Sequence, residues 1–148
     1  MNIKQTTIRA YGPADKQRLL DIWHRASLKA HHFLPPELLA LHQQMVGEIY
    51  LEKAETFVAI RDALPIGFIG LLGNHIGGLF VDPDCQGGGI GRLLVAHALG
   101  LKGGLELEVY ARNKGACGFY RRLGFLETGR RPTDDNGLPF ELIAMRLG

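Results

Sequence analysis

Between Gly12 and Tyr50, hydrophobic residues recur with the three-to-four-residue period of amphipathic helices. The first stripe predicts a helix that begins near Pro13, and its buried positions are Leu19, Ile22, Trp23, Ala26 and Ala30. The segment from His31 to Pro36 interrupts the stripe, because a residue that precedes proline avoids helical angles. A second helix is predicted after it, with an apolar face formed by Leu38, Leu41, Met45 and Ile49.

Strand patterns precede the first helix and dominate the chain after residue 55. The clearest alternation sets the apolar residues Leu105, Leu107, Val109 and Ala111 against Glu106, Glu108 and Tyr110. Strands are predicted over residues 7–11, 56–60, 66–72, 75–81, 105–111, 125–130 and 140–147, with turns at 62–65 and, of hairpin type, at 134–137. Helices are predicted over residues 90–101 and 116–123. The order of these elements predicts an α/β fold.

A glycine-rich loop follows the predicted strand that ends at Val81. It comprises Gln86, Gly87, Gly88, Gly89, Ile90, Gly91 and Arg92, and it leads directly into a predicted helix. Glycines leave backbone N–H groups free to approach a ligand, since no Cβ atoms stand in the way. A helix N-terminus adds unpaired donors and a partial positive charge. The loop therefore predicts a site for a pyrophosphate.

Three kinds of phosphate loop compete for this segment. A Walker A loop needs a Gly-Lys-Ser/Thr triplet, which the chain lacks. A dinucleotide fingerprint fits in part, because Glu108 stands at a suitable distance for a ribose carboxylate, although Leu94 occupies the place of the third glycine. The third pattern, Gln/Arg-x-x-Gly-x-Gly/Ala, is matched in full by residues 86–91.

A second motif follows the loop by about one helix and one strand. Residues 113–125 read Asn-Lys-Gly-Ala-Cys-Gly-Phe-Tyr-Arg-Arg-Leu-Gly-Phe, and together with the loop they resemble the GCN5-related N-acetyltransferase (GNAT) superfamily. The resemblance implies an α/β fold with a mixed, largely antiparallel sheet of six to seven strands and helices on both faces. A single domain over residues 1–148 is expected. Trp23, Ser27 and the run His32-Phe33-Leu34 also resemble a bacterial subgroup, the YjaB-type acetyltransferases.

This resemblance implies acetyl-CoA as cosubstrate, with its diphosphate on the glycine loop. The pantetheine arm is expected beside the backbone of Leu79, Phe80 and Val81, where this strand and the strand over 105–111 splay apart. Asn113 is expected to bind the pantetheine or to position the helix that follows it.

The paired glycines Gly77 and Gly78 within the same strand predict a β-bulge, which would turn a backbone N–H toward the thioester oxygen. The alternative is that two small residues merely relieve crowding.

The resemblance implies transfer of an acetyl group to a primary amine by direct attack. Tyr120 is expected to be the general acid for the departing CoA thiolate, since a phenol with a pKa of about 10 stays protonated at neutral pH. His75 is expected to be the base, with His31 and His32 in reserve. The alternative is that Tyr120 is a core residue and His75 a structural or surface one.

Composition narrows the remaining possibilities. Seventeen basic and 15 acidic side chains give a net charge of +2, which is too balanced to predict binding to nucleic acid or to a membrane. No run of about 18 apolar residues occurs and no signal segment precedes the domain, so we expect a cytoplasmic protein. Cys85 and Cys117 have no metal-binding spacing, and no metal is expected.

Two features stay open. The acceptor is a small amine or a peptidyl lysine, and the protein is a monomer or a homodimer. The alternative functions are a non-catalytic acyl-CoA-binding regulator and a nucleotide-binding module. Release of free CoA thiol from acetyl-CoA would exclude the regulator. Failure of CoA to compete for the site would favour the nucleotide-binding module.

Overall fold

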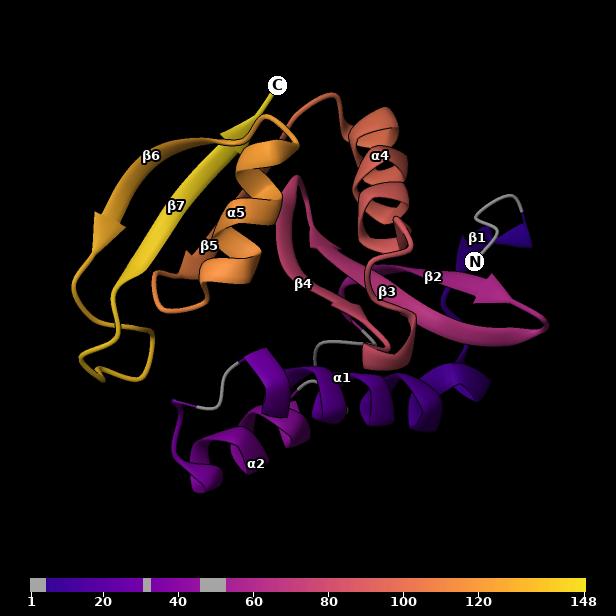
Figure 1. Ribbon diagram of the computed structural model, residues 1–148, viewed down its shortest axis with the longest axis horizontal. Coiled ribbons are helices and arrows are strands. Elements are labelled where there is room, and N and C mark those ends of the chain that lie inside the picture. The colour runs from indigo at the N-terminus through magenta and orange to yellow at the C-terminus, as the bar shows by residue number, and fades with distance from the viewer. Residues whose placement is uncertain (1–4, 31–32, 46–52) are drawn as a thin grey trace.

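The computed structural model describes residues 5–30, 33–45 and 53–148, and it forms a seven-stranded sheet flanked by helices (Figure 1). The strands are β1 (Thr7–Ala10), β2 (Glu55–Arg61), β3 (Leu64–Leu72), β4 (His75–Val81), β5 (Leu105–Tyr110), β6 (Leu126–Arg131) and β7 (Leu142–Leu147). The helices are η2 (Pro13–Asp15), α1 (Lys16–Ala30), α2 (Pro36–Met45), η4 (Pro83–Cys85), α4 (Ile90–Lys102) and α5 (Lys114–Arg122). Within these ranges no helix is both long and apolar enough to cross a bilayer.

The strands lie in the order β1-β2-β3-β4-β5-β7-β6. β1 to β4 pair antiparallel in chain order, and β7 pairs antiparallel with both β5 and β6. β4 and β5 form the parallel pair, which needs a crossover, and α4 supplies it. The prediction of a mixed, largely antiparallel sheet is confirmed.

Helices cover both faces of the sheet. α1 lies across one face with α2 beside it, and α4 and α5 cover the other face (Figure 1). Because successive strand residues point to opposite faces, β2 and β3 serve both layers. Val58 and Phe68 pack with Trp23 of α1, whereas their neighbours Ala59 and Ile69 pack in the cluster that contains α4.

The apolar face predicted for the second helix is wrong in one respect. Leu39 is buried, whereas Leu41 is 48% exposed. The run of leucines at 38, 39 and 41 permits two buried faces, and the fold buries the one that contains Leu39. Ile49 lies outside the described residues, and α2 ends at Met45.

The turn between β2 and β3 is shorter than predicted. β3 begins at Leu64, so the hairpin loop consists of Asp62 and Ala63, both with positive φ (53° and 63°). Two positive φ values match the two-residue hairpin turn whose twist suits the strands. Pro65 then lies beside the register shift between Ala59 and Ile60, where a missing N–H is tolerated.

The predicted turn at 134–137 lies inside a longer connection between β6 and β7, over residues 132–141. The buried carboxylate of Asp134 organises this connection, because it accepts the N–H groups of Asn136 (2.9 Å) and Leu138 (3.0 Å). The hydroxyl of Tyr110 in β5 also donates to it at 3.2 Å.

Candidate functional site

β4 and β5 part from one another in the middle of the sheet. They pair at His75 with Glu106 and at Ile76 with Leu107, and in the described structure no further register partners follow. β4 and β5 diverge beyond this point (Figure 1). β4 stays paired with β3 as far as Val81, so only its edge toward β5 is left without a strand. The predicted splay is therefore present, and an extended ligand can pair with that edge.

A β-bulge interrupts β4 at the paired glycines, as predicted. Gly70 of β3 pairs with Gly78 and Leu71 pairs with Ile76, which leaves Gly77 as the extra residue. A Cβ on Gly78 would lie 2.8 Å from the Phe80 ring, so a side chain there would displace the ring. Crowding thus explains Gly78, and the bulge itself explains Gly77.

The bulge shifts the alternation of side chains along β4, and so changes which residues face each helix layer. Ile76 and Leu79 both pack in the cluster with α4 and α5, although regular alternation would separate them. Phe80 faces α1, where its ring lies 6.4 Å from that of Trp23. His75 precedes Ile76 and so points to the α1 face, where its register partner Glu106 also lies.

The glycine loop is a row of unpaired donors. Gly87 and Gly89 both have φ of +83°, and Gly89 is the N-cap of α4. Among the described residues, no backbone N–H from Gln86 to Arg92 has an acceptor, and the first such bond runs from Leu93 to the Gly89 carbonyl (3.0 Å). The first turn of α4 carries no acidic residue. Seven consecutive free amides at a helix N-terminus suit a diphosphate.

Asn113 begins the helix that carries Tyr120. Its side chain accepts the Ala116 N–H at 3.2 Å, and its carbonyl accepts the Cys117 N–H at 3.0 Å. Of the two roles expected for Asn113, positioning the following helix is therefore seen directly.

Tyr120 is a buried phenol, 8% exposed, between the rings of Phe119 (5.2 Å) and Phe125 (5.3 Å). Within the described part of the chain its hydroxyl makes no hydrogen bond, and burial raises the pKa of the phenol above its usual value. Tyr120 thus keeps its phenolic proton, and no acceptor among the described residues binds that proton.

The structure brings α5, the helix that carries Tyr120, against the glycine loop. A Cβ on Gly91 would lie 3.1 Å from Phe119, so α4 and α5 meet closely at this glycine. Tyr120, Leu79 and Val81 belong to or pack against one hydrophobic cluster. His75, by contrast, lies on the opposite face of the sheet from Tyr120. His31 and His32 lie outside the described residues.

Comparisons with known proteins agree with this geometry. The acetyltransferase (GNAT) domain matches residues 52–127 of the chain. Over 137 residues the chain is 40% identical to peptidyl-lysine N-acetyltransferase YjaB of Salmonella typhimurium, and the match covers 92% of this chain and 94% of that protein. The chain belongs to the GNAT acetyltransferase family.

Solved structures support this GNAT acetyltransferase fold. The solution structure of apo YjaB from Escherichia coli superposes with a TM-score of 0.87 at 37% identity, covering 95% of this chain and 96% of that one. PaiA N-acetyltransferase of Thermoplasma acidophilum, solved in complex with coenzyme A, has a TM-score of 0.77 at 18% identity, with 96% and 99% coverage. Like other members of the family, this N-acetyltransferase uses acetyl-CoA as its cosubstrate.

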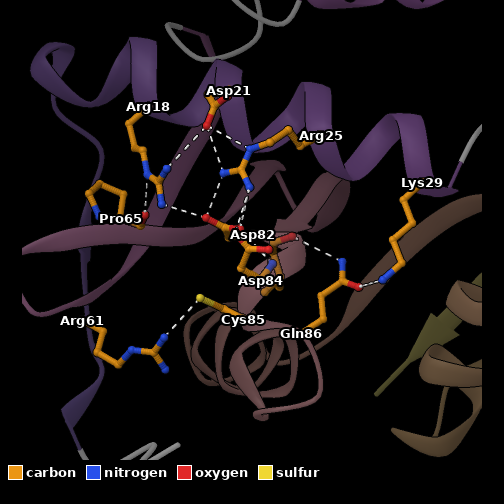
Figure 2. A network of polar contacts seen from close by, with 11 residues as sticks. Arg18, Asp21, Arg25, Lys29, Arg61, Pro65, Asp82, Asp84, Cys85 and Gln86 are labelled. Carbon is orange, nitrogen blue, oxygen red and sulfur yellow. Dashed lines mark hydrogen bonds and ion pairs between the residues drawn. The ribbon is translucent and has the colours of Figure 1, made fainter.

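Sequence reasoning missed an ionic cluster beside the glycine loop of this acetyltransferase (Figure 2). Asp82 follows β4, and its buried carboxylate accepts from Arg25 (2.9 Å for both nitrogens) and Arg18 (2.8 Å) of α1. An open cavity of about 510 Å³ beside it is lined partly by these groups and by Cys85, not by the splayed edges of β4 and β5. The signal available in the sequence was the helical spacing of Arg18, Arg25 and Lys29.

We expect this cluster to make the fold of the GNAT acetyltransferase sensitive to acid. Hydrogen bonds from Arg25 lower the pKa of the Asp82 carboxyl to about 2. The ionised carboxylate therefore stabilises the fold at every pH above about 3.9, the pKa of an aspartate in the unfolded chain. This contribution is lost as the pH falls toward 2, because the carboxylate is then protonated in the folded protein as well. Urea unfolding measures this effect: between pH 7 and pH 3, the free energy of unfolding should fall by about 1 kcal/mol less in Asp82→Asn than in the unmodified chain. Equal losses would contradict the assignment.

Proposed function

We propose that this enzyme acetylates the side-chain amine of peptidyl lysine by direct attack on acetyl-CoA. The observation that carries the proposal is the row of free amides from Gln86 to Arg92 beside a splayed strand edge and a buried phenol. Relatives named peptidyl-lysine N-acetyltransferase support the acceptor class.

The cosubstrate lies along β4 in this proposal. The amides of residues 86–92 hold the diphosphate, and Arg92, exposed in the first turn of α4, adds positive charge nearby. The pantetheine pairs with the free backbone edge of Leu79 to Val81 and brings the thioester to the bulge. A backbone N–H at Gly77 or Gly78 then stabilises the oxyanion that forms on the thioester carbonyl.

Tyr120 acts as the general acid. The amine nitrogen bonds to the thioester carbon, the carbon–sulfur bond breaks, and the departing sulfur takes the phenolic proton. The raised pKa keeps the Tyr120 hydroxyl protonated at neutral pH, and no hydrogen bond within the described residues competes for that proton.

His75 acts as the base, directly or through one water molecule. A lysine amine with a pKa of about 10.4 is mostly protonated at pH 7, and its deprotonation costs about 4–5 kcal/mol. His75 faces the α1 side of the sheet and Tyr120 the α5 side. Acid and base on opposite faces suit a thioester that lies in the opening of the sheet, with the amine on one side and the sulfur on the other.

His75→Ala is expected to lower kcat/KM about a hundredfold at pH 7, because the variant must use the rare neutral amine. The defect should shrink as the pH approaches the amine pKa of about 10, where no base is needed. Release of CoA thiol with a lysine peptide measures both effects. His24→Ala, at an exposed position of α1, is the control and should stay within about twofold of the unmodified enzyme. An unchanged pH profile for His75→Ala would exclude it as the base.

The acceptor class is tested with the same assay. Lysine peptides, free amino acids and small primary amines are offered separately, and peptidyl lysine should give the highest kcat/KM. Mass spectrometry of the peptide should show the acetyl group on the lysine side chain. A preference of more than tenfold for a free amine would overturn the peptidyl-lysine assignment, and binding of acetyl-CoA without thiol release would support a regulator.

A further inference from the structure

α1 reaches the turn that leads from β4 into the glycine loop at several points (Figure 2). Arg18 donates to the Pro65 carbonyl (2.9 Å) and to Asp82, and Arg25 donates to Asp82 with two nitrogens. One helical turn further on, Lys29 contacts the side-chain oxygen of Gln86 at 3.2 Å. Basic residues at 18, 25 and 29 share one face of a helix, so α1 presents all three to this turn. Asp21 lies between Arg18 and Arg25 and forms ion pairs with both, at 3.5 and 3.0 Å.

Asp82 connects the two sides of this contact. Its carboxylate is 5% exposed, accepts three N–H groups from Arg18 and Arg25, and also accepts the backbone N–H of Asp84 at 3.0 Å. Its own backbone N–H donates to the Ile66 carbonyl at 2.8 Å. The start of the turn is therefore held to α1 through charged groups and to β3 through the backbone.

The loop after this turn has little to hold it in place. Gly87, Gly88 and Gly89 have the widest backbone freedom of any residues, and the free amides around them make no internal hydrogen bonds within the described residues. A loop that must converge its amides on one anion binds more tightly when its conformation is set beforehand. The only side-chain anchors described between Asp82 and Ile90 are those of Asp82, Asp84, Cys85 and Gln86.

We propose that Asp82 is a positioning residue for the cosubstrate: clamped by Arg18 and Arg25, it sets the direction in which the chain enters the glycine loop. This inference rests on the proposed place of the diphosphate. Asparagine at 82 offers Arg25 one oxygen where the carboxylate offers two, and it removes the negative charge. The turn loosens, and acetyl-CoA binds more weakly although Tyr120 and His75 are untouched.

A matched control lies in η2, directly before α1. Asp15 is also buried, takes two hydrogen bonds from Arg9 (2.7 and 2.8 Å) and accepts a backbone N–H, that of Gly12 (2.9 Å). Asp15 is thus a second buried, arginine-bound carboxylate whose hydrogen bonds within the described residues go to Arg9 and Gly12, and not to the turn over 82–86. Asp15→Asn tests whether lost stability alone changes cosubstrate binding.

The experiment measures acetyl-CoA affinity by calorimetry and steady-state kinetics for the whole chain and its variants. Asp82→Asn and Arg25→Gln should each raise the acetyl-CoA Kd and KM about tenfold, with kcat at saturating acetyl-CoA within about twofold. The double variant should bind acetyl-CoA no more weakly than either single variant, since both substitutions break the same contact between Asp82 and Arg25. Asp15→Asn should keep the Kd within about twofold.

The outcomes separate this inference from the proposed function. A folded Asp82→Asn or Arg25→Gln variant that binds acetyl-CoA like the unmodified chain overturns the positioning role, as does an equal loss in Asp15→Asn. If Asp82→Asn does not fold, Arg25→Gln decides alone. A different result would contradict the proposed cofactor site itself. In that case, substitutions in the glycine loop would leave the acetyl-CoA Kd unchanged.

Discussion

Tyr120→Phe should lower kcat at least a hundredfold and leave the Kd for acetyl-CoA within about twofold. The substitution removes only the hydroxyl, and the ring contacts with Phe119 and Phe125 remain. Since the hydroxyl has no hydrogen-bond partner among the described residues, its loss should also cost little folding stability. Without the phenolic proton, the CoA sulfur must leave as a thiolate or take its proton from water.

Thiol release and acetyl-CoA titration, followed together, check this result. Tyr11→Phe is the control, because Tyr11 packs against the cluster on the α1 face, whereas Tyr120 belongs to the cluster on the opposite face. Its kcat should stay within about twofold of the unmodified enzyme. A Tyr120→Phe enzyme that keeps more than half of its kcat would show that another group, or water, protonates the leaving sulfur.

Gly87→Asp should raise the Kd for acetyl-CoA by at least about a hundredfold, which corresponds to roughly 2.7 kcal/mol of binding free energy. The new carboxylate lies among the amides of residues 86–92, where it repels the diphosphate and competes for the same donors. Space is not the obstacle, because no atom lies within 4 Å of a Cβ placed on Gly87.

Gly73→Asp controls for backbone strain in this comparison. Gly73 also has a positive φ, +62° against +83° at Gly87, and open space around its Cβ position, but it lies in the turn between β3 and β4. Both substitutions should therefore destabilise the fold by about 1–2 kcal/mol, measured by urea unfolding. Only Gly87→Asp should weaken binding. If Gly87→Asp changes the Kd by less than about threefold, the diphosphate lies elsewhere.

The pattern of the sequence predicted elements well where the signal is local. β4 was expected over 75–81 and has those bounds, and the paired glycines predicted its bulge. The hairpin turn at Asp62 and Ala63 was placed too broadly, since alanine rarely takes positive φ and carries no turn signal. At the second helix, three leucines allowed two faces, and only the tertiary structure selected one.

The site divides in a similar way. The glycine loop, the Asn113 cap and Tyr120 follow from short motifs whose geometry depends on neighbours in the chain. The face that His75 presents does not, because the bulge at Gly77 shifts the alternation of β4 and so decides which residues share a side of the sheet. The Asp82 cluster is non-local as well, since its partners Arg25 and Arg18 lie 57 and 64 residues away in the chain.

The sequence by itself therefore determined the kind of enzyme and the presence of a glycine loop and a phenol suited to the proposed reaction, because amides and a phenol keep their chemistry wherever the chain carries them. Tertiary structure alone decided the relation between these groups. It placed Tyr120 and His75 on opposite faces of an opened sheet and held the entrance of the loop to α1. The physical reason is that such relations arise from packing and ion pairs between distant segments, which no local pattern encodes.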